Sequence, residues 1–157
     1  MNSEAIDHLI NIVRKMTEKE VCNALYRDCL TGAWNRRAFE ATSSPFVGIV
    51  DMDSLKYLND SYGHRVGDSA LIELAGVLVE EFGGEDVYRI SGDEFAVRGH
   101  DISFGEHFYR ARRRYDRFSF GVGYCLESAD EYLKCDKEVR QRLGLRAPRG
   151  ERPPWLD

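Results

Sequence analysis

A tight turn between two β-prone runs constrains the fold of this chain more than any other feature of its sequence. Residues 88–97 read YRISGDEFAV, so that Asp93 and Glu94 separate the runs 87–90 and 95–98. Because strand interiors disfavour charged side chains, we expect the two acids at the tip of a β-hairpin. The chain is therefore expected to fold around a sheet in which two neighbouring strands are antiparallel.

The segments on either side of this hairpin predict an alternation of strands and helices. Their apolar residues recur either continuously, as in a buried strand, or at a spacing of three to four, as in an amphipathic helix. The expected elements are a short helix over 35–42, strand 46–51, helix 69–82, strands 87–90 and 95–98, helix 104–115, strand 118–124 and helix 128–143.

From strand 46–51 onwards the order reads β-α-β-β-α-β, which is the ferredoxin-like split βαβ pattern. We therefore predict an α+β fold, in which an antiparallel sheet is backed by helices on one face. The N-terminal helix and the last helix, 128–143, are additions to this core. Residues 1–27 form a separate N-terminal helix, or short stalk, and residues 28–145 form the main domain. The apolar repeat of the stalk either packs on that domain or pairs with a second copy. The Pro/Arg-rich tail, residues 146–157, is expected to be loose or irregularly docked.

The charge and hydropathy of the chain exclude several classes of partner. The 157 residues carry a formal net charge of −5 with both signs interspersed, so bulk binding to nucleic acid or to an acidic membrane is not expected. No apolar run approaches the roughly 20 residues of a membrane span. The first residues also lack the basic-then-apolar order of a signal peptide. We therefore expect a cytoplasmic location.

Acidic side chains are expected to converge at one end of the sheet. Asp51 ends the first buried strand, and this strand lies beside the central hairpin in the split βαβ topology. Carboxylates brought together repel one another unless a cation neutralises them. Mg²⁺ binds through one or two carboxylates plus substrate phosphates, and two such ions suit phosphoryl transfer. Asp51, Asp93 and Glu94 thus indicate a metal–nucleotide site, whereas Asp53 is either part of it or a solvated loop or helix-start acid.

The segment after strand 46–51 offers groups that can bind a nucleotide. Lys56 can meet phosphate oxygens as a point charge, or it is an exposed lysine without a role. Asn59 and Asp68 carry an amide and a carboxylate that can bind the edge of a guanine base. Asp68 has an alternative role as the N-cap of the following helix.

Four sequence blocks follow one another along the chain, DCLTGAWNRR (28–37), DMDSLKYLNDSYGHRVGD (51–68), YRISGDEF (88–95) and FSFGVG (118–123). Taken together in this order, they resemble the GGDEF domain of diguanylate cyclases. The resemblance covers most of residues 28–143 and departs from the signature in having Ser91 at its first glycine.

This resemblance implies a polymerase-palm-like fold and the condensation of two GTP molecules into cyclic di-GMP. It implies two Mg²⁺ (or Mn²⁺) ions per active site, bound by Asp51, Asp93, Glu94 and the Met52 carbonyl. Asp93 would also assist deprotonation of the attacking 3′-hydroxyl.

The resemblance also implies a set of substrate-binding residues. Asn59 and Asp68 match guanine-reading positions, and the turn of Ser54, Leu55 and Lys56 matches a phosphate-cradling segment. The family's lysine and arginine that grip the β- and γ-phosphates have no direct counterpart, because the lysine position is aligned with Leu143. Arg142 and Arg146 keep the four-residue spacing and are the candidates to replace them.

The implied reaction needs a homodimer, because each subunit would hold one GTP. We expect regulation by a separate protein, by self-association or by expression. Two alternative functions stay open. One is a GTP-binding regulatory module that has lost turnover, which Ser91 and Leu143 would favour. The other is a synthase of another cyclic dinucleotide, although the Asp68 carboxylate suits guanine better than adenine.

Overall fold

Strand β2 (Phe46–Met52) lies inside the sheet because its side chains are buried on both faces. In the computed structural model, which describes residues 3–156, Val50 and Met52 belong to the largest hydrophobic cluster. Val47 and Ile49 alternate with them and belong to two smaller clusters on the other face. The continuous apolar sequence of this segment therefore predicted its strand correctly.

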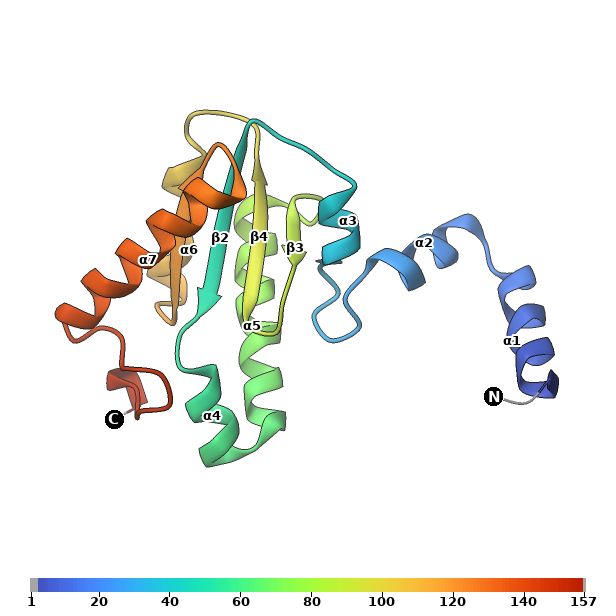
Figure 1. Cartoon of the computed structure of the whole chain (residues 1–157), viewed down its shortest axis with the longest axis horizontal. Coiled ribbons are helices and arrows are strands. Elements are labelled where there is room, and N and C mark those ends of the chain that lie inside the picture. The colour runs from blue at the N-terminus through green and yellow to red at the C-terminus, as the bar shows by residue number, and fades with distance from the viewer. Residues whose placement is uncertain (1–2, 157) are drawn as a thin grey trace.

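The remaining elements follow the predicted order, with a two-residue strand, the helix α4 and a 3₁₀ helix added and the N-terminal helix divided in two. The helices are α1 (Ser3–Lys15), α2 (Glu18–Tyr26), α3 (Arg36–Glu40), α4 (Leu55–Tyr62), α5 (His64–Phe82), α6 (Phe104–Arg114), α7 (Leu126–Arg142) and the 3₁₀ helix η1 (Pro154–Leu156). The other strands are β1 (Trp34–Asn35), β3 (Val87–Arg89), β4 (Glu94–Gly99) and β5 (Phe118–Gly123). Figure 1 shows their arrangement.

The sheet has the strand order β1-β3-β4-β2-β5. Strand β2 pairs antiparallel with β4 and with β5, and β3 pairs antiparallel with β4, as the split βαβ pattern requires. The short β1 adds a parallel pair at the edge next to β3, so the five-stranded sheet is mixed. The predicted α+β fold class is confirmed.

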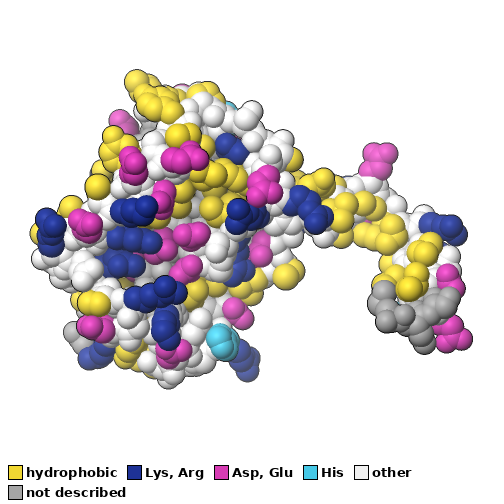
Figure 2. Space-filling view, in the orientation of Figure 1, with side chains coloured by type: hydrophobic (Ala, Val, Ile, Leu, Met, Phe, Trp, Pro, Cys, Tyr) yellow, Lys and Arg dark blue, Asp and Glu magenta, His cyan; other side chains and the backbone are white. Residues whose placement is uncertain are grey.

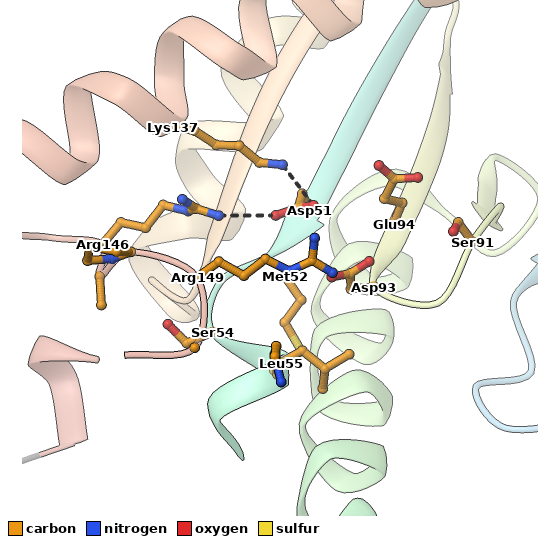
Figure 3. A pocket seen from close by; sticks show the side chains of 14 residues that line it. Asp51, Met52, Ser54, Leu55, Ser91, Asp93, Glu94, Lys137, Arg146 and Arg149 are labelled. Atoms are coloured by element: carbon orange, nitrogen blue, oxygen red, sulfur yellow. Dashed lines mark ion pairs between the residues drawn. The ribbon is translucent and has the colours of Figure 1, made fainter. Parts of the chain in front are cut away.

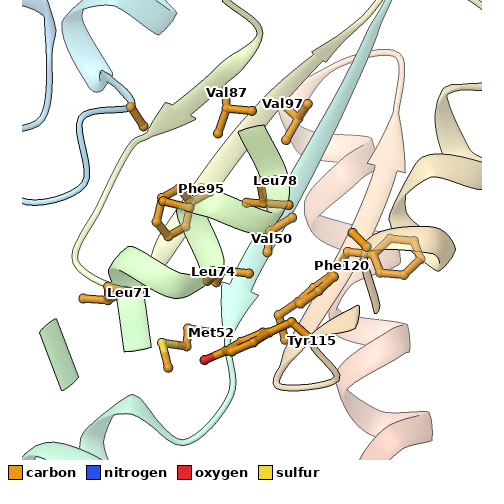
Figure 4. Packing of buried hydrophobic residues seen from close by; sticks show 14 of the residues in the cluster. Val50, Met52, Leu71, Leu74, Leu78, Val87, Phe95, Val97, Tyr115 and Phe120 are labelled. Atoms are coloured by element: carbon orange, nitrogen blue, oxygen red, sulfur yellow. The ribbon is translucent and has the colours of Figure 1, made fainter. Parts of the chain in front are cut away.

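The two helices of the split βαβ core cover one face of the sheet, as predicted, and the added last helix covers the other face. Helices α5 and α6 pack over the main core, which Figure 4 shows in close-up. Helix α7 crosses the opposite face, where Ile49 packs with Ala129 and Leu133. The approach is close because β5 carries glycine there. A β-carbon at Gly121 would lie 2.1 Å from the Ala129 carbonyl oxygen.

The N-terminal segment forms two helices where the sequence predicted one. Helix α1 ends at Lys15, and Thr17 caps α2 in a capping box with Glu20. Figure 1 shows both helices extending away from the sheet, and Figure 2 shows hydrophobic side chains along them. The apolar side chains of α1, including Ile10 and Val13, are exposed, so α1 does not pack on its own domain.

The polar segment after β2 folds into the helix pair α4–α5. Helix α5 begins at His64, so Asp68 lies inside the helix and is not its N-cap. Gly63, with φ 86°, joins the two helices. A β-carbon at Gly67 would lie 2.0 Å from the Asn59 side-chain oxygen, so the helices are in close contact at this point. No helix among residues 3–156 is long and apolar enough to span a membrane.

Candidate active site

Asp51 and Glu94 face each other across two neighbouring strands at one end of the sheet. They are register partners in the antiparallel pair β2–β4, and side chains of such partners point to the same face. Asp93 directly precedes β4, and its carbonyl oxygen accepts the Met52 N–H at 2.9 Å. The hairpin turn is thereby attached to the end of β2, and three acids meet at the same sheet end.

Residues 90–93 form the turn between β3 and β4, which we call the signature turn, and Arg89 on β3 stabilises it. Its guanidinium donates to the Gly92 carbonyl oxygen at 2.7 Å and forms an ion pair with Asp28 at 3.1 Å. Ser91 has an ordinary backbone conformation, since Ser54 is the one described non-glycine residue with positive φ. Serine in place of the first signature glycine therefore costs no backbone strain here.

A polar cavity of about 360 Å³ opens beside these acids, and Figure 3 shows its lining side chains. It lies between β2, the signature turn, the start of α4 and the segment that follows α7. The lining residues are Asp51, Met52, Ser54, Leu55, Lys56, Ser91, Asp93, Glu94, Lys137, Arg146, Ala147, Pro148, Arg149 and Gly150.

Two cations already contact the buried carboxylate of Asp51. Lys137 Nζ lies 2.8 Å from one carboxylate oxygen, and an Arg146 nitrogen lies 3.7 Å from the other (Figure 3). Burial raises the pKa of Asp51, while the Lys137 and Arg146 charges oppose this shift. The negative charge of Asp93 also raises the pKa of Asp51, so the two acids are close enough to interact electrostatically. The site can therefore hold positive charge between them.

Asp53 is fully buried and does not line the cavity. Its carboxylate accepts a hydrogen bond from Ser119 Oγ at 2.9 Å and pairs with Arg146 at 2.6 Å and Arg140 at 3.3 Å. The expectation of a solvated loop acid is thus wrong. Asp53 connects the end of β2 to the end of α7 and the segment after it.

The turn between β2 and α4 has an unusual backbone and an unpaired hydroxyl. Ser54 adopts the left-handed conformation, with φ 63° and ψ 20°, immediately before α4. Its Oγ atom is buried and has no hydrogen-bond partner among the described residues. A buried polar atom without a partner costs free energy, so this position favours a ligand that can pair with it.

Comparison with known sequences decides the family. The sequence model described as "Diguanylate cyclase, GGDEF domain" matches residues 25–122, more than half of the chain. The chain belongs to the GGDEF domain family. The matched part contains the strands β1 to β4, most of β5, and the helices α3 to α6, whereas α7 and the tail lie outside it.

Individual relatives agree with this assignment. Diguanylate cyclase DgcN of Escherichia coli is 41% identical over 88 residues, which are 48% of this chain and 21% of that protein. Diguanylate cyclase DgcS of Shewanella oneidensis is 32% identical over 138 residues, which are 76% of this chain and 47% of that protein. The chain therefore spans from about a fifth to about half the length of these relatives.

The fold is also that of solved GGDEF proteins. A crystal structure of a sensory box/GGDEF family protein from Caulobacter crescentus superposes with a TM-score of 0.59 at 26% identity. The superposition covers 73% of this chain and 99% of that one. The polymerase-palm-like fold expected from the resemblance is confirmed.

The structure brings most of the predicted site residues of this GGDEF domain to one cavity. The acids, the Ser54–Lys56 turn and Arg146 all line it. Asn59 and Asp68 do not line it and lie on the helix pair α4–α5. Arg142 is 79% exposed and pairs with Glu138, so it lies away from the cavity. The roles assigned to all these residues stay predictions.

Two cations of the cavity were missed by the sequence analysis, Lys137 and Arg149. The position expected for the phosphate-gripping lysine, Leu143, is an exposed residue at the end of α7. Helix periodicity could have found Lys137, because it follows the inward-facing Leu133 by four residues and shares its face. No comparable signal marks Arg149, which lies in the irregular tail.

The oxygen atoms at this site suit a hard cation that arrives together with a nucleotide. Among residues 3–156, no group of three or more His, Cys, Asp or Glu side chains is arranged to enclose a metal ion. Mg²⁺, however, needs only one or two protein carboxylates when substrate phosphates supply further oxygens. Asp51 and Asp93 meet this need, and Ser54, whose hydroxyl is unpaired, lines the same cavity. The donor set therefore fits Mg²⁺ or Mn²⁺.

Proposed function

We propose that this chain is a diguanylate cyclase that condenses two GTP molecules into cyclic di-GMP across a symmetric dimer. The observation that carries the proposal is the meeting of Asp51, Asp93 and Glu94 in one cavity with the strained turn at Ser54. The family's name and the names of its relatives support the same activity. Acids beside a polar cavity suit phosphoryl transfer.

Each part of the cavity has a role in this proposal. Asp51, Asp93, Glu94 and the Met52 carbonyl would hold two divalent cations, which supply charge neutralisation at the triphosphate. The hydroxyl of Ser54 and the ammonium group of Lys56 would hold phosphate oxygens next to Leu55. Lys137 and Arg146 would release Asp51 and pair with the β- and γ-phosphates, because a carboxylate that binds a dication no longer needs them.

The guanine base would lie beside the helix pair α4–α5. There the amide of Asn59 and the carboxylate of Asp68 would read its edge, since a carboxylate accepts from N1–H and the 2-amino group. Asp93 would accept the proton of the 3′-hydroxyl. That oxygen would attack the α-phosphorus of the partner subunit's GTP, and pyrophosphate would leave. Positioning and charge neutralisation would supply most of the rate.

Incubation with GTP and Mg²⁺, followed by mass spectrometry of the products, tests this proposal. We expect cyclic di-GMP from GTP and no cyclic product from ATP. Asp93→Asn should lower the rate by about 100-fold or more, because a positioned acid–base group contributes at least that much. A hairpin tip accommodates asparagine, so the fold should persist.

The matched control is Asp130→Asn, an exposed acid that pairs with Lys134 on α7. It should leave the rate unchanged. Absence of any cyclic dinucleotide at high protein concentration would contradict the proposal. Binding of GTP without product would instead identify a regulatory binding module.

A further inference from the structure

The segment after α7 is fixed at both of its ends. We call residues 145–156 the C-terminal strap. It begins where Gly144, with φ 70°, ends α7, and the Leu145 N–H bonds to the Arg140 carbonyl oxygen at 2.9 Å. At its far end Pro153 is fully buried, and the Arg117 guanidinium lies 4.3 Å from the centre of the Trp155 ring. The strap is thus docked on the domain and does not form a loose tail.

The middle of the strap forms one wall of the cavity. Five consecutive residues, 146–150, line it. Gly150 lies opposite α4, where a β-carbon at this position would be 3.9 Å from Lys56 Cε. The strap therefore runs from the end of α7 to the turn that we propose for phosphate binding. The family match ends at residue 122, so it assigns no role to this segment.

Arg149 differs from the other cations of the cavity in having no acidic partner. Lys137 and Arg146 pair with Asp51, and Lys56 pairs with Asp60 at 2.6 Å. Within the described part of the chain, Arg149 forms no ion pair. Figure 3 shows its side chain reaching across the cavity toward Asp93, between the strap and the signature turn. Its guanidinium is thus free to bind an anion that enters the cavity.

We propose that Arg149 binds the triphosphate group of the nucleotide. This inference rests on the proposed function, because it extends the same site by one residue. A guanidinium offers two parallel N–H donors to phosphate oxygens, which makes arginine suited to this task. Both ends of the strap are docked, so little conformational freedom of the backbone is lost when Arg149 closes on the phosphates. Through this residue the strap completes the nucleotide site on the side opposite the acids.

Binding measurements with nucleotides of different phosphate number test the assignment. Isothermal titration calorimetry would compare an α,β-methylene analogue of GTP with GMP, each in Mg²⁺, on the full chain. Arg149→Ala should weaken binding of the triphosphate analogue about tenfold and leave GMP binding unchanged, since one charge-assisted contact is lost. Arg149→Lys should restore part of the affinity, because a lysine keeps the positive charge but cannot donate two parallel hydrogen bonds.

The control is Arg110→Ala, which removes a half-exposed arginine from α6 on the other side of the sheet. This variant should bind the triphosphate analogue and GMP as tightly as the wild type does. Equal affinity of Arg149→Ala and wild type for the triphosphate analogue would overturn the inference and leave the proposed function intact. Equal weakening for the analogue and for GMP would also overturn it, because that pattern indicates a structural role. If the wild-type chain bound neither nucleotide, the inference and the proposed function would both fail.

Discussion

At the scale of single residues, the buried ion-pair group around Asp53 holds the site together. Asp53 and Arg140 are both buried, and Arg140 also pairs with Asp116 at 2.7 Å. Removing one partner of a buried pair leaves the other charge without compensation. Because Asp53 directly precedes Ser54, the position of the turn between β2 and α4 depends on these ion pairs.

Arg140→Ala should therefore destabilise the fold by about 3 kcal/mol, the usual cost of an uncompensated buried charge. Urea unfolding followed by circular dichroism measures this change. Arg142→Ala, which removes an exposed arginine from the same helix, should change the free energy of unfolding by less than about 0.5 kcal/mol. If both variants lost equally little free energy of unfolding, Arg146 alone would be sufficient to compensate the charge of Asp53.

At the scale of elements, the close contact between β5 and α7 determines where Lys137 lies. Gly121→Ala places a methyl group 2.1 Å from the Ala129 oxygen and 2.2 Å from the Leu133 nitrogen, and backbone atoms of a helix cannot move aside singly. We expect a loss of about 2 kcal/mol in unfolding free energy, as for overpacking in a core. Displacement of α7 should also weaken GTP binding through Lys137.

Gly76→Ala provides the matched control on α5. Nothing lies within 4 Å of a β-carbon at this position, so the variant should gain about 0.5–1 kcal/mol from higher helix propensity. A Gly121→Ala variant as stable as wild type would mean that α7 can shift without cost. Lys137 would then not be held in place by this contact.

The elements that could be predicted from sequence are those with a clear apolar period. The buried run of β2, the amphipathic α5 and the hairpin around Asp93 were expected in place, and they explain why the three acids meet. The break between α1 and α2 was missed, because the apolar repeat slips near Glu20 but resumes at Val21, so one helix was predicted across the capping box of Thr17 and Glu20. Such local hydrogen bonds compete with helix continuation, and periodicity does not report them.

Contacts between distant segments could not be predicted in the same way. Ser54, directly before helix α4, has a left-handed backbone conformation. Few non-glycine residues adopt this conformation, and the sequence did not indicate it. The strap docks through Pro153 and Trp155, whose partners lie elsewhere in the chain. The ion pairs of Asp53 likewise join distant parts of the chain, since Asp53 and Arg140 are 87 positions apart. These features follow from tertiary packing alone.

At the scale of the whole molecule, the exposed apolar face of α1 offers a contact for the dimer that the proposed reaction needs. Ile10→Glu should weaken dimerisation by about tenfold or more, because burial of one such side chain contributes roughly 1.5–3 kcal/mol. Sedimentation equilibrium measures the dimer directly. The turnover rate per chain should rise with protein concentration, and the variant should need more protein to reach the same rate.

Ile102→Glu is the control for this change, because Ile102 is 96% exposed in a loop outside the stalk. It should leave the monomer–dimer equilibrium as in wild type. If Ile10→Glu behaved like Ile102→Glu in both measurements, the apolar face of α1 would not be the dimer contact.

The backbone of Ser54 links the stability of the whole chain to the nucleotide binding that we propose for this turn. A non-glycine residue in the left-handed region lowers the stability of the fold by about 1–3 kcal/mol. This strain is present in the protein without a nucleotide. Selection for a more stable protein would favour glycine at this position, whereas selection for fast nucleotide capture would favour the rigid serine. If the proposed function holds, thermal stability and nucleotide binding make opposite demands on position 54.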